Sequence, residues 1–91
     1  MIDVSHANSS KQYARQIDVA QEVADQIGGG DSRITGLMIE SHLREGRQDK
    51  VEGKALERGV SVTDACISTA QTAPILQSLA IAVRNRRTLA R

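Results

Sequence analysis

The alternation of apolar and polar residues along the chain predicts the order strand, helix, strand, long loop, helix. Residues 1–5 form a short apolar run that is compatible with a β-strand. From residue 11 to residue 27, apolar side chains recur every three or four positions, which indicates an amphipathic helix. Its apolar face holds Tyr13, Ala14, Ile17, Ala20, Val23, Ala24 and Ile27, and its polar face holds Lys11, Gln12, Arg15, Gln16, Asp18, Gln21, Glu22 and Asp25.

The ends of this helix and the strand after it carry recognisable signals. Ser9 or Ser10 is expected to cap the start of the helix, and glycines 28–30 are expected to end it. Residues 34–39 are almost continuously apolar and are followed by Glu40, which is typical of a parallel strand covered on both faces. Strand, helix and strand together predict a right-handed βαβ crossover.

Residues 41–71 form a long polar connection with scattered glycines and alternating charges. We expect it to be functional rather than disordered, because it leaves the carboxyl end of a strand, where α/β proteins bind ligands, and because residues 60–67 are apolar enough to pack. The last helix is predicted over residues 72–90, with Thr72 as its cap and Pro74 in its first turn. Its predicted apolar stripe contains Ile75, Leu76, Leu79, Ala80, Val83 and Leu89.

The composition points to an incomplete core. The chain has 91 residues, so it is at most one small domain, and it has one Tyr but no Phe or Trp. Aromatic side chains bury the largest apolar area per residue, so a small domain without them has little to pack. We therefore expect this core to be part of a larger one.

Charge and cysteine content restrict the partners and the compartment. The net charge of +1 gives no strong field for nucleic acid or an anionic membrane, and no apolar run approaches the ~18 residues of a membrane span. The single cysteine, Cys66, excludes an internal disulfide and fits a cytoplasmic location. The arginines near the end of the chain are interpreted as solvated cations that complement a helix dipole: Arg84, Arg86, Arg87 and Arg91.

Three residues that could carry chemistry follow the predicted strands or lie in the long loop: His6, Glu40 and Asp64. Adjacent parallel strands lie about 4.8 Å apart, so a histidine and a glutamate at neighbouring strand ends can reach one ion, and a loop aspartate can fold over it. An imidazole with two carboxylates suits a divalent metal such as Mn²⁺, Fe²⁺, Co²⁺ or Zn²⁺.

His42 and Cys66 are alternatives to this group. If the strand continues past Glu40, then Glu40 and His42 point to the same face, and if a turn intervenes they do not. A solvated or hydrogen-bonding role is the simpler interpretation of His42. Cys66 lies in an apolar context, where a free cysteine packs more often than it reacts.

Three blocks of sequence occur in order: residues 3–11 (DVSHANSSK), residues 39–43 (IESHL) followed by Glu45, Gly46 and Gln48, and residues 61–67 (SVTDACI). They closely resemble the carboxyl-terminal part of class I 3-deoxy-D-arabino-heptulosonate 7-phosphate (DAHP) synthases, the aldolase-like enzymes that open the shikimate pathway. The resemblance spans essentially the whole chain.

This resemblance implies a TIM (β/α)8 barrel, of which the chain would be the last two βα units, in the order β-α-β-loop-α. It implies that His6, Glu40 and Asp64 are three of four metal ligands. Phosphoenolpyruvate and erythrose 4-phosphate would condense at the metal, with His6 near the former and Asp64 near the phosphate of the latter, so that both residues take part in catalysis.

The family's other functional residues have no counterpart here. Its fourth ligand is a cysteine at the end of the first barrel strand, whereas Cys66 matches a cysteine beside the aspartate ligand. The lysines and arginines that hold the substrate phosphates also belong to earlier strands. Residues 1–91 are therefore expected to form a single segment, the carboxyl-terminal quarter of the synthase domain, inactive alone.

Such a segment is expected to pair with the rest of the barrel or to self-associate through exposed strand edges. Residues 68–71 (STAQ) depart from the family, which usually has a glycine or acidic residue, a tryptophan and an acidic pair there, so the resemblance does not predict the packing before the last helix. The alternative is a standalone, non-enzymatic interaction module, descended from the enzyme, that binds a partner through its exposed apolar sheet face.

Overall fold

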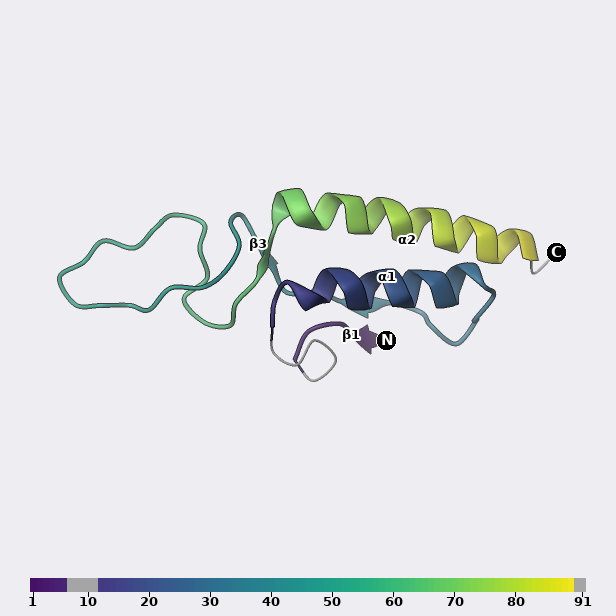
Figure 1. Cartoon of the computed structure of the whole chain (residues 1–91), viewed down its shortest axis with the longest axis horizontal. Helices are drawn as coiled ribbons and strands as arrows, with labels where there is room; N and C mark the ends of the chain where they lie inside the picture. The colour runs from purple at the N-terminus through teal and green to yellow at the C-terminus, as the bar shows by residue number, and fades with distance from the viewer. Residues whose placement is uncertain (7–11, 90–91) are drawn as a thin grey trace.

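The computed structural model describes residues 1–6 and 12–89, which form two helices beside short pairs of strands (Figure 1). The elements in chain order are β1 (Ile2–Asp3), α1 (Arg15–Gly28), β2 (Leu37–Met38), β3 (Ser41–His42), β4 (Ile67–Ser68) and α2 (Thr69–Leu89). The α/β class predicted from the sequence is therefore confirmed. Neither helix in these ranges is long and apolar enough to cross a membrane.

β1 and β2 pair in parallel and form the first strand pair. Asp3 lies opposite Met38, and one residue further on the Val4 N–H donates to the Met38 carbonyl at 3.0 Å. The paired segments are shorter than the predicted strands, residues 1–5 and 34–39. β2 is half-buried rather than covered on both faces, and within the described residues it pairs with β1 alone. The predicted β-α-β order of this half is confirmed.

The second strand pair was not predicted from the sequence. β3 pairs in parallel with β4, with Ser41 opposite Ile67, inside the stretch that was expected to be a loop. β3 consists of two exposed polar residues, so it has no apolar alternation that could mark it as a strand. Ile67, by contrast, is completely buried, so β4 provides the apolar contact of this pair.

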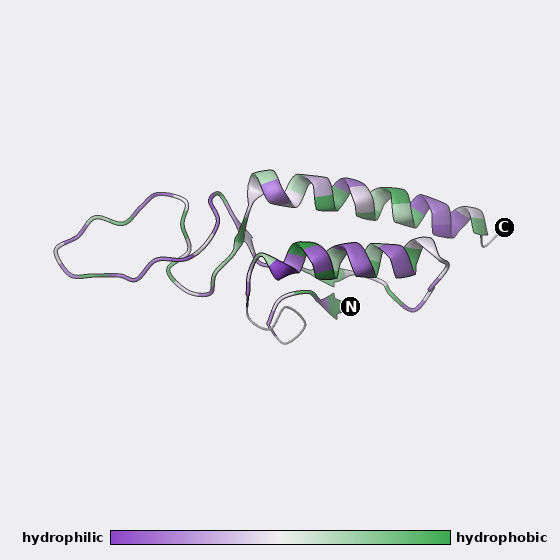
Figure 2. Ribbon diagram, in the orientation of Figure 1, coloured by the Kyte–Doolittle hydropathy of each residue, from purple (hydrophilic) through white to green (hydrophobic). Residues whose placement is uncertain are grey.

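The core lies between the two helices and the strands, and apolar and polar residues alternate along both helices (Figure 2). Tyr13, the only aromatic residue, is partly buried against this core. The buried members are all aliphatic: Val4, Ala20, Val23, Ala24, Ile27, Ile34, Ile67, Ile75 and Ala82.

The first helix begins later than predicted and ends as predicted. α1 starts at Arg15, with Ala14 at its N-cap and no side-chain hydrogen bond from that residue. The expected caps, Ser9 and Ser10, lie outside the described residues. At the other end, Gly29 is the C-cap, and the next residue, Gly30, has a φ of +108°, the left-handed conformation that was expected to end this helix.

Gln16 corrects the predicted polar face of α1. Helical spacing placed it among the exposed residues, yet its exposed fraction is 0%. Its side-chain amide donates from Nε2 to the Glu40 carbonyl at 3.1 Å, and its Oε1 accepts from the Glu40 N–H at 2.8 Å. A buried amide without partners would cost ~1–3 kcal/mol, so these two bonds are what allows Gln16 to face inward.

The second helix begins three residues before the predicted cap. α2 starts at Thr69, and the preceding Ser68 caps it: the Gln71 N–H donates to Ser68 Oγ at 3.1 Å, and the Ser68 N–H donates to Gln71 Oε1 at 2.8 Å. This reciprocal pair is a capping box, which satisfies two backbone donors at the helix start. Thr72, the predicted cap, lies inside the helix, and Pro74 therefore lies beyond the first turn.

Only part of the predicted apolar stripe of α2 faces the core. Ile75 is buried, and Leu79 and Val83 pack against the buried cluster. Leu76 and Leu89 are 57% and 63% exposed, because α1 and the strands cover one side of α2 only. Ala80, which was also predicted in the stripe, is exposed.

Residues 43–66 extend away from the helices as a long loop (Figure 1). The molecule measures 60 × 23 × 16 Å, and its radius of gyration of 15.5 Å exceeds the ~12 Å of a compact domain of this length. Gln48 holds the loop together, since its side chain bonds the N–H and carbonyl of Glu57 and the carbonyl of Val60. The loop is thus internally ordered although it makes few contacts with the helices.

The expected packing of residues 60–67 is confirmed for three of them. Ser61, Cys66 and Ile67 are buried. Cys66 also exchanges two backbone hydrogen bonds with Gly46, at 2.8 and 3.1 Å, which closes the loop at its base.

Arg86 departs from the expectation that the arginines near the end of the chain are solvated. It is half-buried, and its Nη1 donates to the carbonyls of Asp31 at 3.0 Å and Ile34 at 2.7 Å. Arg84 and Arg87 are exposed as expected, and Arg91 lies outside the described residues. Arg86 therefore ties the end of α2 to the connection between α1 and β2.

We predict that Arg86→Met lowers the free energy of unfolding by about 2 kcal/mol, because hydrogen bonds from a charged group to two carbonyls are lost while the apolar stem is kept. Chemical denaturation followed by circular dichroism measures the change. The control is Arg84→Met, an exposed arginine on the same helix, which should change stability by no more than a few tenths of a kcal/mol. Equal effects of the two substitutions would contradict this role of Arg86.

Candidate metal centre

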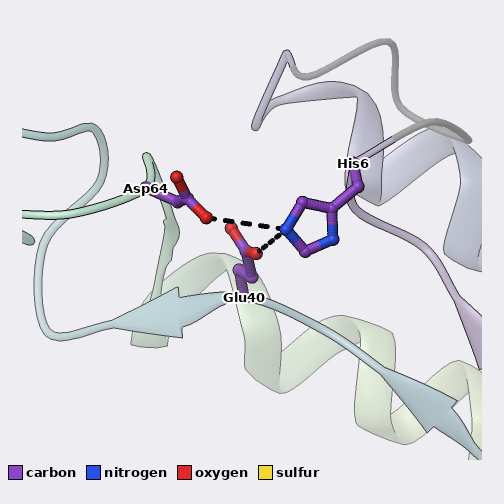
Figure 3. A group of neighbouring side chains, drawn as sticks. All are labelled: His6, Glu40 and Asp64. Carbon is purple, nitrogen blue, oxygen red and sulfur yellow. Dashed lines mark ion pairs between the residues drawn. The ribbon is translucent and has the colours of Figure 1, made fainter.

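The structure brings together His6, Glu40 and Asp64, the three residues singled out from the sequence (Figure 3). One ligand atom from each lies within 4.8 Å of the others. Both carboxylates approach the same ring nitrogen: His6 Nε2 is 2.9 Å from Glu40 Oε1 and 3.5 Å from Asp64 Oδ2. Three electron-pair donors therefore converge on one point, as a cation site requires.

His6 lies just after β1 in an uncommon backbone conformation. Its φ of +46° is in the left-handed region, which costs a residue other than glycine ~1–3 kcal/mol. The turn is supported by Asp3, whose Oδ1 accepts hydrogen bonds from the Ser5 N–H at 2.8 Å and the Ser5 hydroxyl at 2.7 Å. Strain of this kind is common at functional sites, and here it directs the imidazole toward Glu40 and Asp64.

Asp3 also contacts the histidine directly, a contact that the sequence analysis missed. Asp3 Oδ2 lies 2.8 Å from His6 Nδ1, on the side of the ring opposite the other two carboxylates. Histidines that bind metals commonly donate their second ring N–H to a carboxylate, which fixes the tautomer that leaves Nε2 free for the metal. The sequence signal for this contact was an acidic residue, Asp3, three positions before the histidine.

These carboxylates change the titration of His6. The hydrogen bond with Asp3 is the main cause that raises the pKa of His6. Burial opposes this rise, and the negative charge of Glu40 adds a smaller contribution to it. The same hydrogen bond lowers the pKa of Asp3. The site therefore favours a positive charge at the ring, whether from a proton or from a cation.

Glu40 lies in the break between β2 and β3. This position decides whether one strand continues from Glu40 to His42, which the sequence left open. The first strand pair ends at Met38 and the second starts at Ser41, so Glu40 and His42 do not continue one strand. His42 is exposed, its Nδ1 accepts from the Leu43 N–H at 2.8 Å, and it does not belong to the group. The Glu40 side chain, in contrast, is only 19% exposed.

Asp64 reaches the site from the long loop, just before β4. Its side chain is 73% exposed, so the loop backbone rather than packing sets its position. Cys66 is buried close by, and its Sγ donates to the Asp64 carbonyl at 3.4 Å. Burial is the main cause that raises the pKa of the Cys66 thiol, which agrees with its interpretation as a packed rather than reactive cysteine.

A cavity of about 290 Å³ adjoins the three residues. Tyr13 and Gln16 line it from the side of the first helix, and Arg47 lines it from the loop. Arg47 donates from Nε to the Thr63 carbonyl at 2.9 Å and from Nη2 to Asp49 at 2.7 Å. It was not singled out in the sequence, because it lies within a run of alternating charges.

The donor set fits a divalent first-row metal. One imidazole nitrogen and two carboxylates are ligands that Mn²⁺, Fe²⁺, Co²⁺ and Zn²⁺ accept. Three protein ligands leave coordination positions for substrate or water, as catalytic metal sites need. The fold and the site thus define an α/β chain with a candidate metal centre at the ends of its strands.

The chain belongs to the DAHP synthetase I family, whose family model matches residues 1–77. It is 56% identical over 87 residues to phospho-2-dehydro-3-deoxyheptonate aldolase of Haemophilus influenzae, covering 96% of this chain and 24% of that protein. It is 53% identical over 87 residues to the Phe-sensitive enzyme of that name in Escherichia coli K12, covering 96% and 25%. The chain spans about a quarter of these relatives.

A solved structure agrees with these sequence comparisons. Phospho-2-dehydro-3-deoxyheptonate aldolase from Francisella tularensis superposes with a TM-score of 0.85 at 42% sequence identity, over 93% of this chain and 25% of that one. The predicted family resemblance is therefore confirmed, and the chain matches a part of the synthase structure.

We predict that the stability of the metal-free chain decreases as the pH rises above 6.5, the ordinary pKa of histidine. Because folding raises the pKa of His6, its contribution is fully present below pH 6.5 and is lost as the pH rises through the folded-state value. Melting temperatures measured against pH with a chelator present test this.

His6→Gln should remove this pH-dependent decrease, whereas His42→Gln, which changes an exposed histidine outside the group, should keep it. Metal affinity should change in the opposite direction and rise with pH, because a proton competes with the cation at Nε2. Parallel pH profiles for the wild type and His6→Gln would contradict the predicted linkage.

Proposed function

We propose that residues 1–91 are the carboxyl-terminal quarter of a DAHP synthase domain and supply the last two βα units of its TIM barrel. The observation that carries this proposal is the convergence of His6, Glu40 and Asp64 on one point. The parallel pairing of β1 with β2 and the coverage of about a quarter of the relatives support it. In such a barrel, substrates bind at the carboxyl ends of the strands.

In the complete enzyme, phosphoenolpyruvate and erythrose 4-phosphate would condense at this face. C3 of phosphoenolpyruvate forms a bond with the aldehyde carbon of the sugar, water adds at C2, and inorganic phosphate leaves. His6, Glu40 and Asp64 would hold a divalent metal. When bound, this metal would supply Lewis-acid polarisation of the aldehyde oxygen.

The roles of this chain's residues follow from their positions. Asp3 would hold the proton on His6 Nδ1, so that Nε2 faces the metal and the phosphoenolpyruvate side of the cavity. Asp64, on the exposed loop, would lie toward the phosphate of the sugar. His6 and Asp64 are thus the residues of this chain that we place in catalysis.

The chain alone would lack turnover, because the other ligand and the phosphate-binding cations belong to the rest of the barrel. Its elongated shape and its two separate strand pairs leave strand edges for that remainder or for a second copy. We therefore propose that the segment works as part of an assembled barrel.

We predict that the chain binds Mn²⁺ and that Glu40→Gln weakens this binding by at least about 10-fold, since losing a ligand costs no less than losing an outer-shell partner. Isothermal titration calorimetry measures the affinity. The matched control is Glu22→Gln, an exposed glutamate of α1, which should bind Mn²⁺ like the wild type.

Two outcomes would contradict the proposed function. Absence of Mn²⁺ binding, even with the remaining barrel supplied in trans, would refute the proposal that these residues form a metal centre. Condensation of phosphoenolpyruvate with erythrose 4-phosphate by the purified chain alone would show that it is not an incomplete part. If metal binding fails but a partner is captured, the interaction-module alternative gains support.

A further inference from the structure

Gln16 is the most completely buried polar residue near the candidate metal centre. Its exposed fraction is 0%, and it lies on α1, an element that contributes no ligand to the centre. Both polar atoms of its side chain bind one residue, Glu40. An amide that is buried in this way and bonded to the backbone of a candidate ligand needs an explanation beyond packing.

The two hydrogen bonds imitate those of a neighbouring strand. Gln16 Oε1 accepts from the Glu40 N–H at 2.8 Å, and Gln16 Nε2 donates to the Glu40 carbonyl at 3.1 Å. They act at the break between β2 and β3, where Glu40 belongs to neither strand. The Glu40 carbonyl also accepts from the Ile67 N–H at 3.0 Å, so its backbone donor and acceptor are both bonded.

The backbone geometry of Glu40 determines where its carboxylate can point. With the N–H and the carbonyl fixed, the direction of the Cα–Cβ bond is fixed as well, and the half-buried side chain reaches His6 Nε2 at 2.9 Å. Metal sites need their ligands held within ~0.5 Å of the productive geometry by outer contacts. The first helix thus contributes to the position of Glu40 through the side-chain amide of Gln16.

We propose that Gln16 is a positioning residue for the metal centre: it holds the backbone of Glu40, and through it the carboxylate, in line with His6 and Asp64. This inference rests on the proposed function, because it assigns Gln16 to the same centre. It goes beyond that function, because Gln16 is not one of the three candidate ligands.

The test is Gln16→Met, which keeps the length and helix preference of the side chain and removes both hydrogen bonds. Mn²⁺ affinity of the 91-residue chain, measured by isothermal titration calorimetry, should fall 10- to 100-fold, the usual effect of losing an outer-shell partner. The stability control is Ile27→Ala, a buried core residue near the other end of α1. It should lower the melting temperature but leave the Mn²⁺ affinity unchanged below that temperature.

Hydrogen exchange at the Glu40 amide gives a second readout that does not depend on metal. In the wild type and in Ile27→Ala this amide should be protected, and in Gln16→Met it should exchange at least about 10-fold faster, because its acceptor is gone. Protection that persists in Gln16→Met would overturn the proposal. So would a wild-type Mn²⁺ affinity in that variant, or an equal loss of affinity in Ile27→Ala.

The two readouts separate this proposal from the proposed function. If the wild-type chain binds no Mn²⁺ even with the remaining barrel supplied in trans, the metal centre fails, and exchange at Glu40 alone then decides whether Gln16 positions that residue. If the wild type binds Mn²⁺ and Gln16→Met binds it equally well, the metal centre stands and the role of Gln16 is refuted.

Discussion

The parallel register of β1 against β2 is the constraint on which the candidate site depends. It brings the chain segments that follow both strands to the same edge, so that His6 and Glu40 emerge side by side. The second pair extends this arrangement, because the Ile67 N–H donates to the Glu40 carbonyl and so places the start of β4 next to the same residue. Asp64, three positions before Ile67, then reaches the site from the long loop.

The β-α-β order of the first half was predictable from the sequence, whereas the second strand pair and the roles of Gln16 and Asp3 were not. Apolar runs predicted β1, β2 and the helices, and the rule that parallel strand ends meet at one edge predicted the approach of His6, Glu40 and Asp64. Gln16 was wrongly predicted to be exposed. Helical spacing shows which face of a helix is polar on average, but it cannot show that one side-chain amide bonds a backbone far away in the sequence. Asp3 was missed because its role requires the left-handed turn at His6, which no periodicity signals. The second strand pair was missed because β3 consists of two exposed polar residues, so it has no apolar run to mark it.

Three carboxylates surround the imidazole of His6. A protonated His6 has one N–H at Nε2, and Glu40 at 2.9 Å is placed to accept it. Asp64, at 3.5 Å from the same nitrogen, shares this N–H at a longer distance, and its hydrogen bond is the smallest of the contributions that raise the pKa of His6. Asp3 occupies the other ring nitrogen. Three carboxylates around one imidazole carry more negative charge than one protonated ring can neutralise, and a bound divalent ion would reduce this excess.

The three candidate ligands differ in how firmly the fold holds them. Glu40 is 19% exposed and both of its backbone polar groups are bonded, His6 is 47% exposed on a strained turn, and Asp64 is 73% exposed on the loop. The fold therefore holds Glu40 most firmly and Asp64 least firmly. Because an exposed side chain loses conformational freedom when it binds a metal, the Asp64 side chain would contribute most of the ordering cost. Contacts that order this loop, such as the Gly46–Cys66 pairing and the Gln48 side chain, thus bear on metal affinity as well as on stability.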